Sequence, residues 1–246
     1  MEQTNKDTII NNLMISKGLY CLVSNAKVGK YMFALQLSNA LAKNKQFLGH
    51  STTLTPVLYV STESDRNQIK DRCKLLGIDF PKSYFFIIDK GNKGKKSLFD
   101  IEYELKCFAE EHKGKLVIID MLKDFYLGIS YDINSYQDVG QKLLPKLKEL
   151  CEKYNFAILF THHLNKKGTV LGSTAFDAVV DGKFTSIENK NDKSLIILNT
   201  INRDFVSLDI QLQKNDNQVF SVVEIVEDDD IDNNLISIIK LLSIYR

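Results

Sequence analysis

Short continuous apolar runs alternate along this chain with longer segments in which apolar residues recur at helical spacing. The apolar runs have the composition of strands that are buried on both faces of a parallel sheet, and they predict strands at 19–23, 57–60, 84–88, 116–119 and 156–160. The periodic segments predict helices at 32–43, 68–76, 101–112 and 136–153, the last with a kink or break at Pro145. Strands alternating with helices indicate an α/β domain, in which helices flank a mainly parallel, twisted sheet.

The pattern changes after Gly182. Short strand-like runs near 183–187, 194–200, 208–212 and 219–226 are separated by polar, turn-rich stretches such as 189–192. We expect antiparallel hairpins that extend the sheet, so the domain should cover residues 1–226. An acidic run then opens a tail, 227–246, for which a docking helix and a disordered end both remain open.

Composition narrows the class of protein. At 246 residues and 44% hydrophobic, the chain can form one large globular domain. Its net charge of +1 means that any contact with nucleic acid must be a local patch. The four cysteines are scattered without a CxxC pair, which favours buried free thiols such as Cys21 and Cys107 over a zinc site or disulfides. The polar first residues and the lack of an apolar run of about 18 residues predict a cytoplasmic protein without a membrane partner.

The first predicted strand leads into an altered phosphate-binding loop. The segment Ser24-Asn25-Ala26-Lys27-Val28-Gly29-Lys30-Tyr31 follows the pattern G-x-x-x-x-G-K-[ST], with Ser24 for the first Gly and Tyr31 for the Ser or Thr. In such a loop the backbone N–H groups and the Lys face the phosphates of a nucleoside triphosphate. A Gly-Lys pair alone is a weak signal, and the strand before it and the amphipathic helix after it strengthen the prediction.

Two carboxylates close later strands. Asp120 ends the apolar run 116–119, a Walker B pattern that delivers a carboxylate near magnesium, although an Asp at this place can also cap a strand or turn. Glu63 follows the strand 57–60 and could polarise an attacking water. The segment 62–65 can equally be read as a helix N-cap, and the two interpretations are compatible.

Three further residues are candidates. His162 and His163 end the strand 156–160 on alternating faces, so at most one should face a ligand, where it would sense the γ-phosphate; a capping pair is the alternative. Arg203 follows a strand and could be an arginine finger for a neighbouring subunit, or form a salt bridge with Asp204 or elsewhere. The basic segment 90–96 is interpreted as a solvated loop rather than a contact with a phosphate backbone.

The order of these motifs resembles the RecA-like P-loop ATPases, in particular the branch with RepA-type plasmid replicative helicases, DnaB and KaiC. The similar segments are the phosphate loop with Phe33-Ala34-Leu35-Gln36-Leu37, the run 57–64 followed by a helix with Arg72, the strand 116–120, the sensor strand 161–166, and Leu171-Gly172-Ser173-Thr174-Ala175 with Asp181. The resemblance spans about residues 13–222.

This resemblance implies ATP and Mg²⁺ as ligands. Lys30 would grip phosphate, Asp120 would hold magnesium directly or through water, and Glu63 would activate water. His163 would sense the γ-phosphate, and Arg203 would contact nucleotide across a subunit interface. The resemblance further implies a homo-oligomer, by analogy a hexameric ring, with single-stranded DNA as a candidate partner near Lys166 and Lys167.

The departures from the family pattern leave two functions open. Tyr31 lacks the aliphatic hydroxyl that ligates magnesium, so we expect weaker magnesium affinity and slower hydrolysis, with nucleotide binding less affected. The first hypothesis is an ATPase in DNA replication or maintenance, related to RepA-like helicases. The alternative is a nucleotide-binding regulatory module with impaired hydrolysis. A small-molecule kinase is less favoured, because no lid or acceptor-binding segment is apparent.

Overall fold

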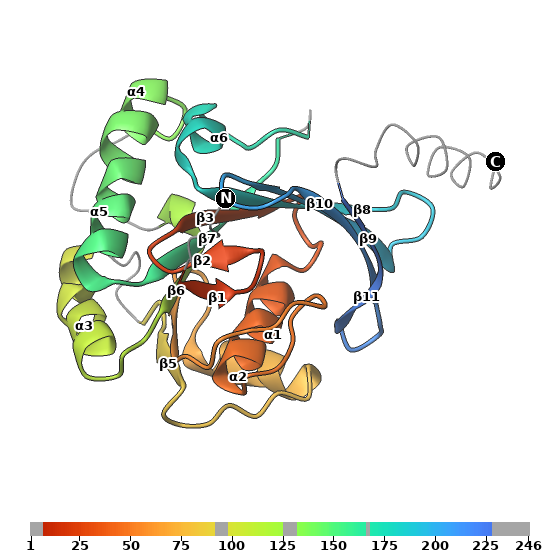
Figure 1. The fold of residues 1–246 in the computed structure, drawn as a ribbon, viewed down its shortest axis with the longest axis horizontal. Coiled ribbons are helices and arrows are strands. Elements are labelled where there is room, and N and C mark those ends of the chain that lie inside the picture. Colours follow the sequence, from red (N-terminus) through yellow and green to blue (C-terminus); the bar gives the residue numbers. More distant parts are fainter. Residues whose placement is uncertain (1–6, 92–97, 125–131, 166–167, 228–246) are drawn as a thin grey trace, which may run out of the picture.

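A twisted, mixed sheet forms the centre of the molecule (Figure 1). The computed structural model describes residues 7–91, 98–124, 132–165 and 168–227. Within these residues, nine strands follow the order β11-β10-β9-β8-β3-β7-β6-β4-β5. Their bounds are β3 Leu19–Ser24, β4 Val57–Ser61, β5 Phe85–Ile88, β6 Leu116–Asp120, β7 Ala157–His163, β8 Gly182–Glu188, β9 Leu195–Asn202, β10 Leu208–Lys214 and β11 Phe220–Glu227. A separate hairpin consists of β1 (Thr8–Ile10) and β2 (Met14–Ile15).

The central strands are parallel and covered on both faces. Every residue of β3 is buried, and its side chains alternate between two apolar clusters: Cys21 and Val23 face one, and Tyr20 and Leu22 face the other. Because both faces exclude water, these strands read as continuous hydrophobic runs. The predicted fold class, a mainly parallel sheet with helices on both faces, is confirmed.

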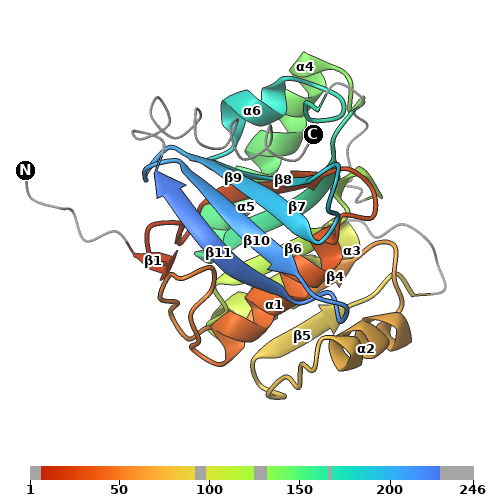
Figure 2. The ribbon, with the colours of Figure 1, turned by 90° about the vertical axis from the view of Figure 1, so that its right-hand side faces the viewer.

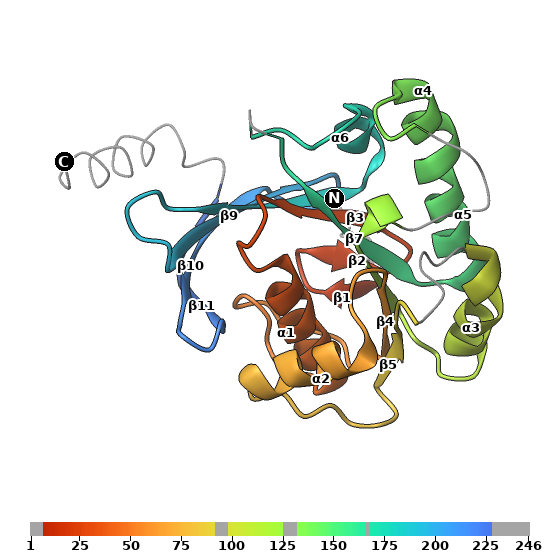
Figure 3. The same ribbon diagram turned by 180° about the vertical axis from the view of Figure 1, so that it is seen from behind.

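Helices cover the two faces of the sheet (Figures 1 and 3). On one side lie α1 (Lys30–Ala42) and α2 (Arg66–Leu75). On the other lie α3 (Leu98–Glu110), α4 (Tyr136–Asp138), α5 (Leu144–Tyr154) and the short α6 (Ala175–Val179). Each predicted central strand and helix is present, and its ends shift by a few residues. The hairpin β1–β2, the 3₁₀ turn Leu122–Asp124 and α6 are too short for a periodic signal, and they were not predicted.

Near Pro145, where a kink or break was predicted, the helix changes type without leaving the helical conformation. A π-helical turn, Val139–Leu143, separates α4 from α5, and Pro145 lies in the first turn of α5. Proline has no N–H to donate to the preceding turn and clashes with the carbonyl four residues earlier, so it disturbs the regular α-helical hydrogen bonding where it lies. The predicted single helix is therefore three consecutive segments.

The C-terminal strands extend the sheet and curl over α1, as Figure 2 shows. The predicted antiparallel pairing is confirmed for β9, β10 and β11, whereas β8 also pairs parallel with β3. The turn between β10 and β11 is attached to α1, because Gln36 Nε2 donates to Gln218 O (3.3 Å) and Gln36 Oε1 accepts from Phe220 N (3.0 Å). This attachment places Gln218 beside the start of α1.

Some predicted segments lie outside the described residues, namely most of the basic loop 90–96 and the tail beyond Glu227. The domain boundary at 226/227 therefore stays a prediction. Within the described part of the chain, no helix is long and apolar enough to cross a membrane. All four cysteines are free; Cys21 and Cys151 are buried, whereas Cys107, expected to be buried, is half-buried.

Candidate functional site

The predicted site residues meet at the carboxyl ends of neighbouring parallel strands. Ser24, the last residue of β3, pairs with His163 at the end of β7, and Ser61 of β4 pairs with Asp120 at the end of β6. Ligands of open α/β sheets bind at this edge, where the order of the strands changes direction. Here β3 lies between β7 and β8, so the loop after β3 starts at such a point.

Gly29 determines the shape of the phosphate loop. Its φ of +115° is a conformation that residues with a side chain rarely adopt, and it directly precedes α1. A Cβ at Gly29 would lie 2.9 Å from Cζ of Phe220, so the Phe220 ring would have to shift to admit one. The backbone conformation therefore favours glycine here, and the packing of Phe220 adds to that preference.

Lys30 is folded back onto the loop. Its ammonium lies 3.0 Å from Ser24 Oγ, 3.2 Å from Ser24 O and 3.3 Å from Asn25 O. It also lies 3.3 Å from Nδ1 of His163. Burial lowers the pKa of Lys30, and the nearby carboxylates of Asp120 and Glu63 oppose this effect. Ser24, which replaces the first Gly of the pattern, thus provides a hydroxyl that holds the lysine.

Asp120 is almost fully buried, with 4% of its surface exposed. The Tyr59 hydroxyl donates to its Oδ2 at 2.8 Å, and the Thr161 hydroxyl donates to its Oδ1 at 2.6 Å. Burial raises the pKa of Asp120, and the two hydroxyl bonds work in the opposite direction. Neither partner was predicted from the sequence. The available signal was a hydroxyl-bearing residue in each of the strands that flank β6, Tyr59 in β4 and Thr161 in β7.

Tyr31 lies where the usual loop has Ser or Thr. Its ring centroid is 5.6 Å from that of Tyr59, and the guanidinium carbon of Arg72 lies 3.8 Å from the centre of the Tyr31 ring. The Tyr31 hydroxyl is buried, and no hydrogen-bond partner for it is found among the described residues. Burial also raises the pKa of Tyr31, while Arg72 acts in the opposite direction.

These contacts test whether the site suits the Mg²⁺ of a phosphate-loop ATPase. That ion is ordinarily held by the Ser or Thr hydroxyl of the loop and by the Walker B Asp. Here the loop position carries a packed aromatic ring, and both oxygens of Asp120 already accept hydrogen bonds from protein hydroxyls. The residues present do not fit the usual magnesium site.

Glu63 lies after β4 and before α2. The N-cap of α2 is Asp65, which accepts from the backbone N–H groups of Asn67 and Gln68. Since Asp65 caps the helix, the carboxylate of Glu63 stands outside the cap, half exposed and 3.6 Å from Nζ of Lys123. The predicted N-cap is therefore confirmed at Asp65, whereas the role of Glu63 toward an attacking water stays a prediction.

The two adjacent histidines face opposite ways. Nδ1 of His163 lies 3.3 Å from the Lys30 ammonium, and burial, together with Lys30 and Lys123, lowers the pKa of His163. The lowered pKa favours the neutral ring, whose unprotonated Nδ1 can accept a hydrogen bond from the ammonium. His162 is buried, with Nε2 2.8 Å from Leu171 O, and burial lowers its pKa to about 4. Only His163 faces the predicted phosphate site, in agreement with the expected alternation.

A cavity of about 290 Å³ joins these groups. Its lining comes from the phosphate loop, the start of α1, the segment between β4 and α2, α2 itself, the ends of β6 and β7, and the β10–β11 turn: Lys27, Gly29, Lys30, Tyr31, Met32, Glu63, Ser64, Arg72, Asp120, Met121, His163 and Gln218. A larger cavity of about 440 Å³ between α1 and the β10–β11 hairpin holds none of the predicted residues. The predicted lysine, Lys30, and the two predicted carboxylates, Glu63 and Asp120, line the smaller cavity.

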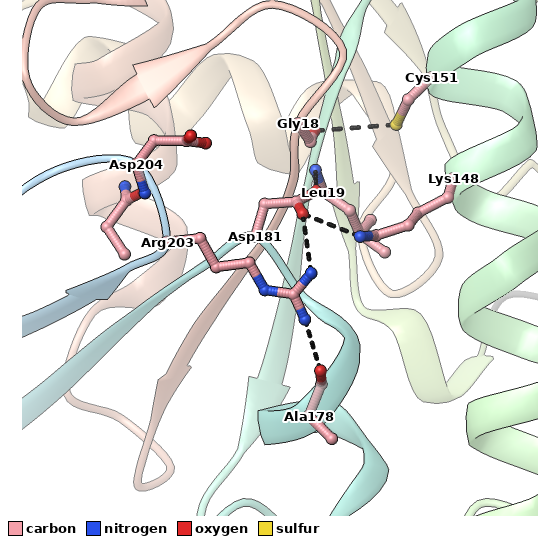
Figure 4. Close-up of polar contacts among 9 residues, drawn as sticks. Gly18, Leu19, Lys148, Cys151, Ala178, Asp181, Arg203 and Asp204 are labelled. Carbon is pink, nitrogen blue, oxygen red and sulfur yellow. Dashed lines mark hydrogen bonds and ion pairs between the residues drawn. The ribbon is translucent and has the colours of Figure 1, made fainter.

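Arg203 lies near the amino-terminal end of β3, at the opposite end of that strand from the phosphate loop. Asn202, the residue before it, pairs with Gly182, which pairs with Tyr20 near the start of β3, whereas the phosphate loop follows the end of β3. The Arg203 guanidinium donates to Ala178 O and is 3.6 Å from Asp181 (Figure 4). The sequence left open an arginine finger or a salt bridge with Asp204 or another residue. In the structure Arg203 forms a salt bridge, and its partner is Asp181. Arg203 cannot reach the phosphate loop of its own chain.

Asp181 is the centre of this second cluster (Figure 4). One of its carboxylate oxygens accepts from Leu19 N at 2.9 Å, and the other accepts from Lys148 Nζ at 2.8 Å. These bonds connect the start of β3 to α5. Lys166 and Lys167, which were predicted to contact nucleic acid, lie outside the described residues. Their contact with nucleic acid stays a prediction.

Comparison with known families agrees with the geometry of the loop. A family model described as an AAA domain matches residues 1–169, more than half of the chain. The chain belongs to the AAA domain family. As an AAA domain it is a P-loop ATPase by family, which implies a nucleotide ligand. No curated protein matches this AAA domain protein.

Proposed function

We propose that this AAA domain protein binds ATP in the 290 Å³ cavity and hydrolyses it slowly. The observation that carries the proposal is the placement of Lys30 and Glu63 in one cavity at the start of α1. A helix N-terminus, a lysine and a loop with left-handed turns at Lys27 and Gly29 together make a site for a polyphosphate.

The roles of the residues follow from their contacts. On binding, the Lys30 ammonium would exchange the carbonyls of Ser24 and Asn25 for phosphate oxygens. The neutral ring of His163, next to Lys30, would hydrogen-bond the terminal phosphate. Glu63 would accept a proton from the attacking water, since its carboxylate is half exposed and lines the cavity.

We further propose a role in DNA replication or maintenance, within a RecA-like branch that includes RepA-type helicases. The order of the motifs supports this placement. Because Arg203 is remote from its own phosphate loop, any contact with nucleotide would be made in a neighbouring copy, which fits a homo-oligomer. In that assembly Arg203 would have to leave Asp181 and Ala178 O, and Lys166 and Lys167 would face single-stranded DNA.

A second function is favoured by the environment of Tyr31. If the packed ring suppresses turnover, ATP acts as a structural ligand or switch, and the protein is a nucleotide-binding regulatory module. Both functions need ATP binding; they differ only in hydrolysis.

Phosphate release measured with the full chain separates the two. For the ATPase, we expect slow release that Glu63→Gln abolishes while ATP binding persists, with Glu149→Gln on the exposed side of α5 as the matched control. Release that is absent in the natural chain and restored by Tyr31→Ser would establish the regulatory module instead.

Assembly tests the proposed partners. Mass photometry with and without ATP and single-stranded DNA should show an oligomer that depends on these ligands. An oligomeric state that ignores both ligands would contradict a ring that translocates on DNA.

A further inference from the structure

Arg72 is one of three cationic residues that line the phosphate cavity, together with Lys27 and Lys30, and its position is tightly defined. Arg72 lies on α2, the second helix after the phosphate loop in the sequence. It nevertheless lines the same cavity as Lys30 and Glu63. Nη1 donates to Ser64 Oγ at 2.8 Å, and the guanidinium lies over the Tyr31 ring, 3.8 Å from its centre. A cation over an aromatic face is attracted by the ring, most strongly where water is excluded.

Tyr31 and Arg72 therefore act as a pair. The tyrosine removes the hydroxyl that would hold a metal ion, and the same ring places a permanent positive charge beside the phosphate loop. A guanidinium has five N–H donors in a planar fork that matches phosphate oxygens, so one bond to Ser64 leaves donor capacity for a ligand.

The two carboxylates of the cavity, Asp120 and Glu63, already have partners within the protein, so the charge of Arg72 remains for a ligand. Asp120 is buried under two hydroxyl bonds, and Glu63 is offset by Lys123 at 3.6 Å. Lys30, Arg72 and the N-terminus of the 13-residue helix α1 all border this cavity and would act together on a bound polyphosphate.

We propose that ATP binds to this protein without a divalent cation, because Arg72, held by the Tyr31 ring, supplies the positive charge that Mg²⁺ supplies in other phosphate-loop proteins. The inference rests on the proposed ATP site, to which it adds Arg72 as a binding residue and a statement about the ion requirement. It concerns the β- and γ-phosphates of a nucleoside triphosphate, and Arg72 is a binding residue in it.

The test is calorimetric titration of the full chain with ATP, in Mg²⁺ and in EDTA. We expect the two dissociation constants of the natural chain to agree within about threefold. Arg72→Gln should weaken binding in EDTA by about tenfold or more, the contribution of one charge-assisted contact. The matched control is Arg66→Gln on the same helix, since Arg66 donates to Ile87 O and does not line the cavity.

Two variants of Tyr31 separate its ring from its hydroxyl. Tyr31→Phe keeps the ring and should retain binding in EDTA. Tyr31→Ser loses the ring and regains an aliphatic hydroxyl, so its ATP binding should become dependent on Mg²⁺. Thermal unfolding of each variant identifies any that fails to fold. Arg72→Lys, which keeps the charge but not the planar fork, is a second variant, and its ATP affinity in EDTA should fall less than that of Arg72→Gln.

The outcomes are distinguishable. Tight ATP binding by the natural chain in Mg²⁺ but not in EDTA would overturn the inference and leave the proposed function intact. Equal affinities of the Arg72→Gln and Arg66→Gln variants in EDTA would also overturn it. A lack of ATP binding under both conditions would overturn the inference together with the proposed function.

Discussion

The buried carboxylate of Asp120 leads to a prediction about stability. Tyr59→Phe removes the hydroxyl that donates to Oδ2 of Asp120 at 2.8 Å and changes little else, because the ring itself is fully buried and stays in place. We expect this variant to be less stable, since one oxygen of a buried carboxyl group loses its donor.

The magnitude follows from the charge of the acceptor. A hydrogen bond to a charged group contributes about 1.5–3 kcal/mol, and one between neutral groups about 0.5–1.5 kcal/mol. Tyr59→Phe should therefore cost about 2 kcal/mol in the natural chain and about 1 kcal/mol when Asp120 is replaced by Asn. The coupling energy between the two sites is then about 1 kcal/mol. In a chain of this size each kcal/mol corresponds to about 2–4 °C in melting temperature.

The shifted pKa of Asp120 also predicts how stability changes with pH. Burial raises the pKa of Asp120 above that in the unfolded chain. Its contribution to stability is therefore fully present below the unfolded pKa and is lost as pH rises through the folded one. Asp120→Asn removes this loss, so by itself it should cost little at pH 7.

The assay is urea unfolding of the four proteins of the cycle at pH 7, with the exposed Tyr136→Phe as control. The reasoning is refuted if Tyr59→Phe costs the same in both backgrounds. That result would mean that the Tyr59 hydroxyl does not hold an ionised Asp120, and that this carboxylate is available to a cation after all.

Two further predictions concern His162 and Asp181. His162 is buried with its pKa lowered to about 4, so its contribution to stability is present above its ordinary pKa of about 6.5 and is lost as pH falls toward 4, by up to about 3 kcal/mol. Urea unfolding at pH 7 and pH 4.5 should show a smaller loss for His162→Gln than for the natural chain; equal losses would contradict the assignment. Asp181→Asn should cost about 2 kcal/mol, because Asp181 accepts from Leu19 N and Lys148, whereas Arg203→Ala should cost under about 1 kcal/mol, because the half-exposed Arg203 pairs at 3.6 Å. Thermal unfolding measures both, and a larger loss for Arg203→Ala would show that the arginine, not the backbone bond, carries this cluster.

The amino-acid sequence determined the central strands, the long helices and the phosphate loop. These are properties of contiguous segments: a strand buried on both faces must be apolar throughout, and a loop that cradles phosphate needs Gly29 and Lys30 as neighbours. The positions of Glu63 and Asp120 at strand ends were predictable for the same reason, because parallel strands bring their carboxyl ends to one edge.

Only the tertiary structure decided what surrounds these residues. Tyr59 lies 61 positions from Asp120, and Thr161 lies 41 positions from it, and the register of β4, β6 and β7 brings the three together. The contact of Arg72 with Tyr31 depends on how α2 packs beside α1, and the remoteness of Arg203 depends on the antiparallel pairing of β9 with β8. No local pattern encodes such distances, because they follow from the order and direction of strands far apart in the chain. Tyr31 shows the difference most clearly: its sequence position indicated only a lost metal ligand, and its packing revealed the arginine held beside it.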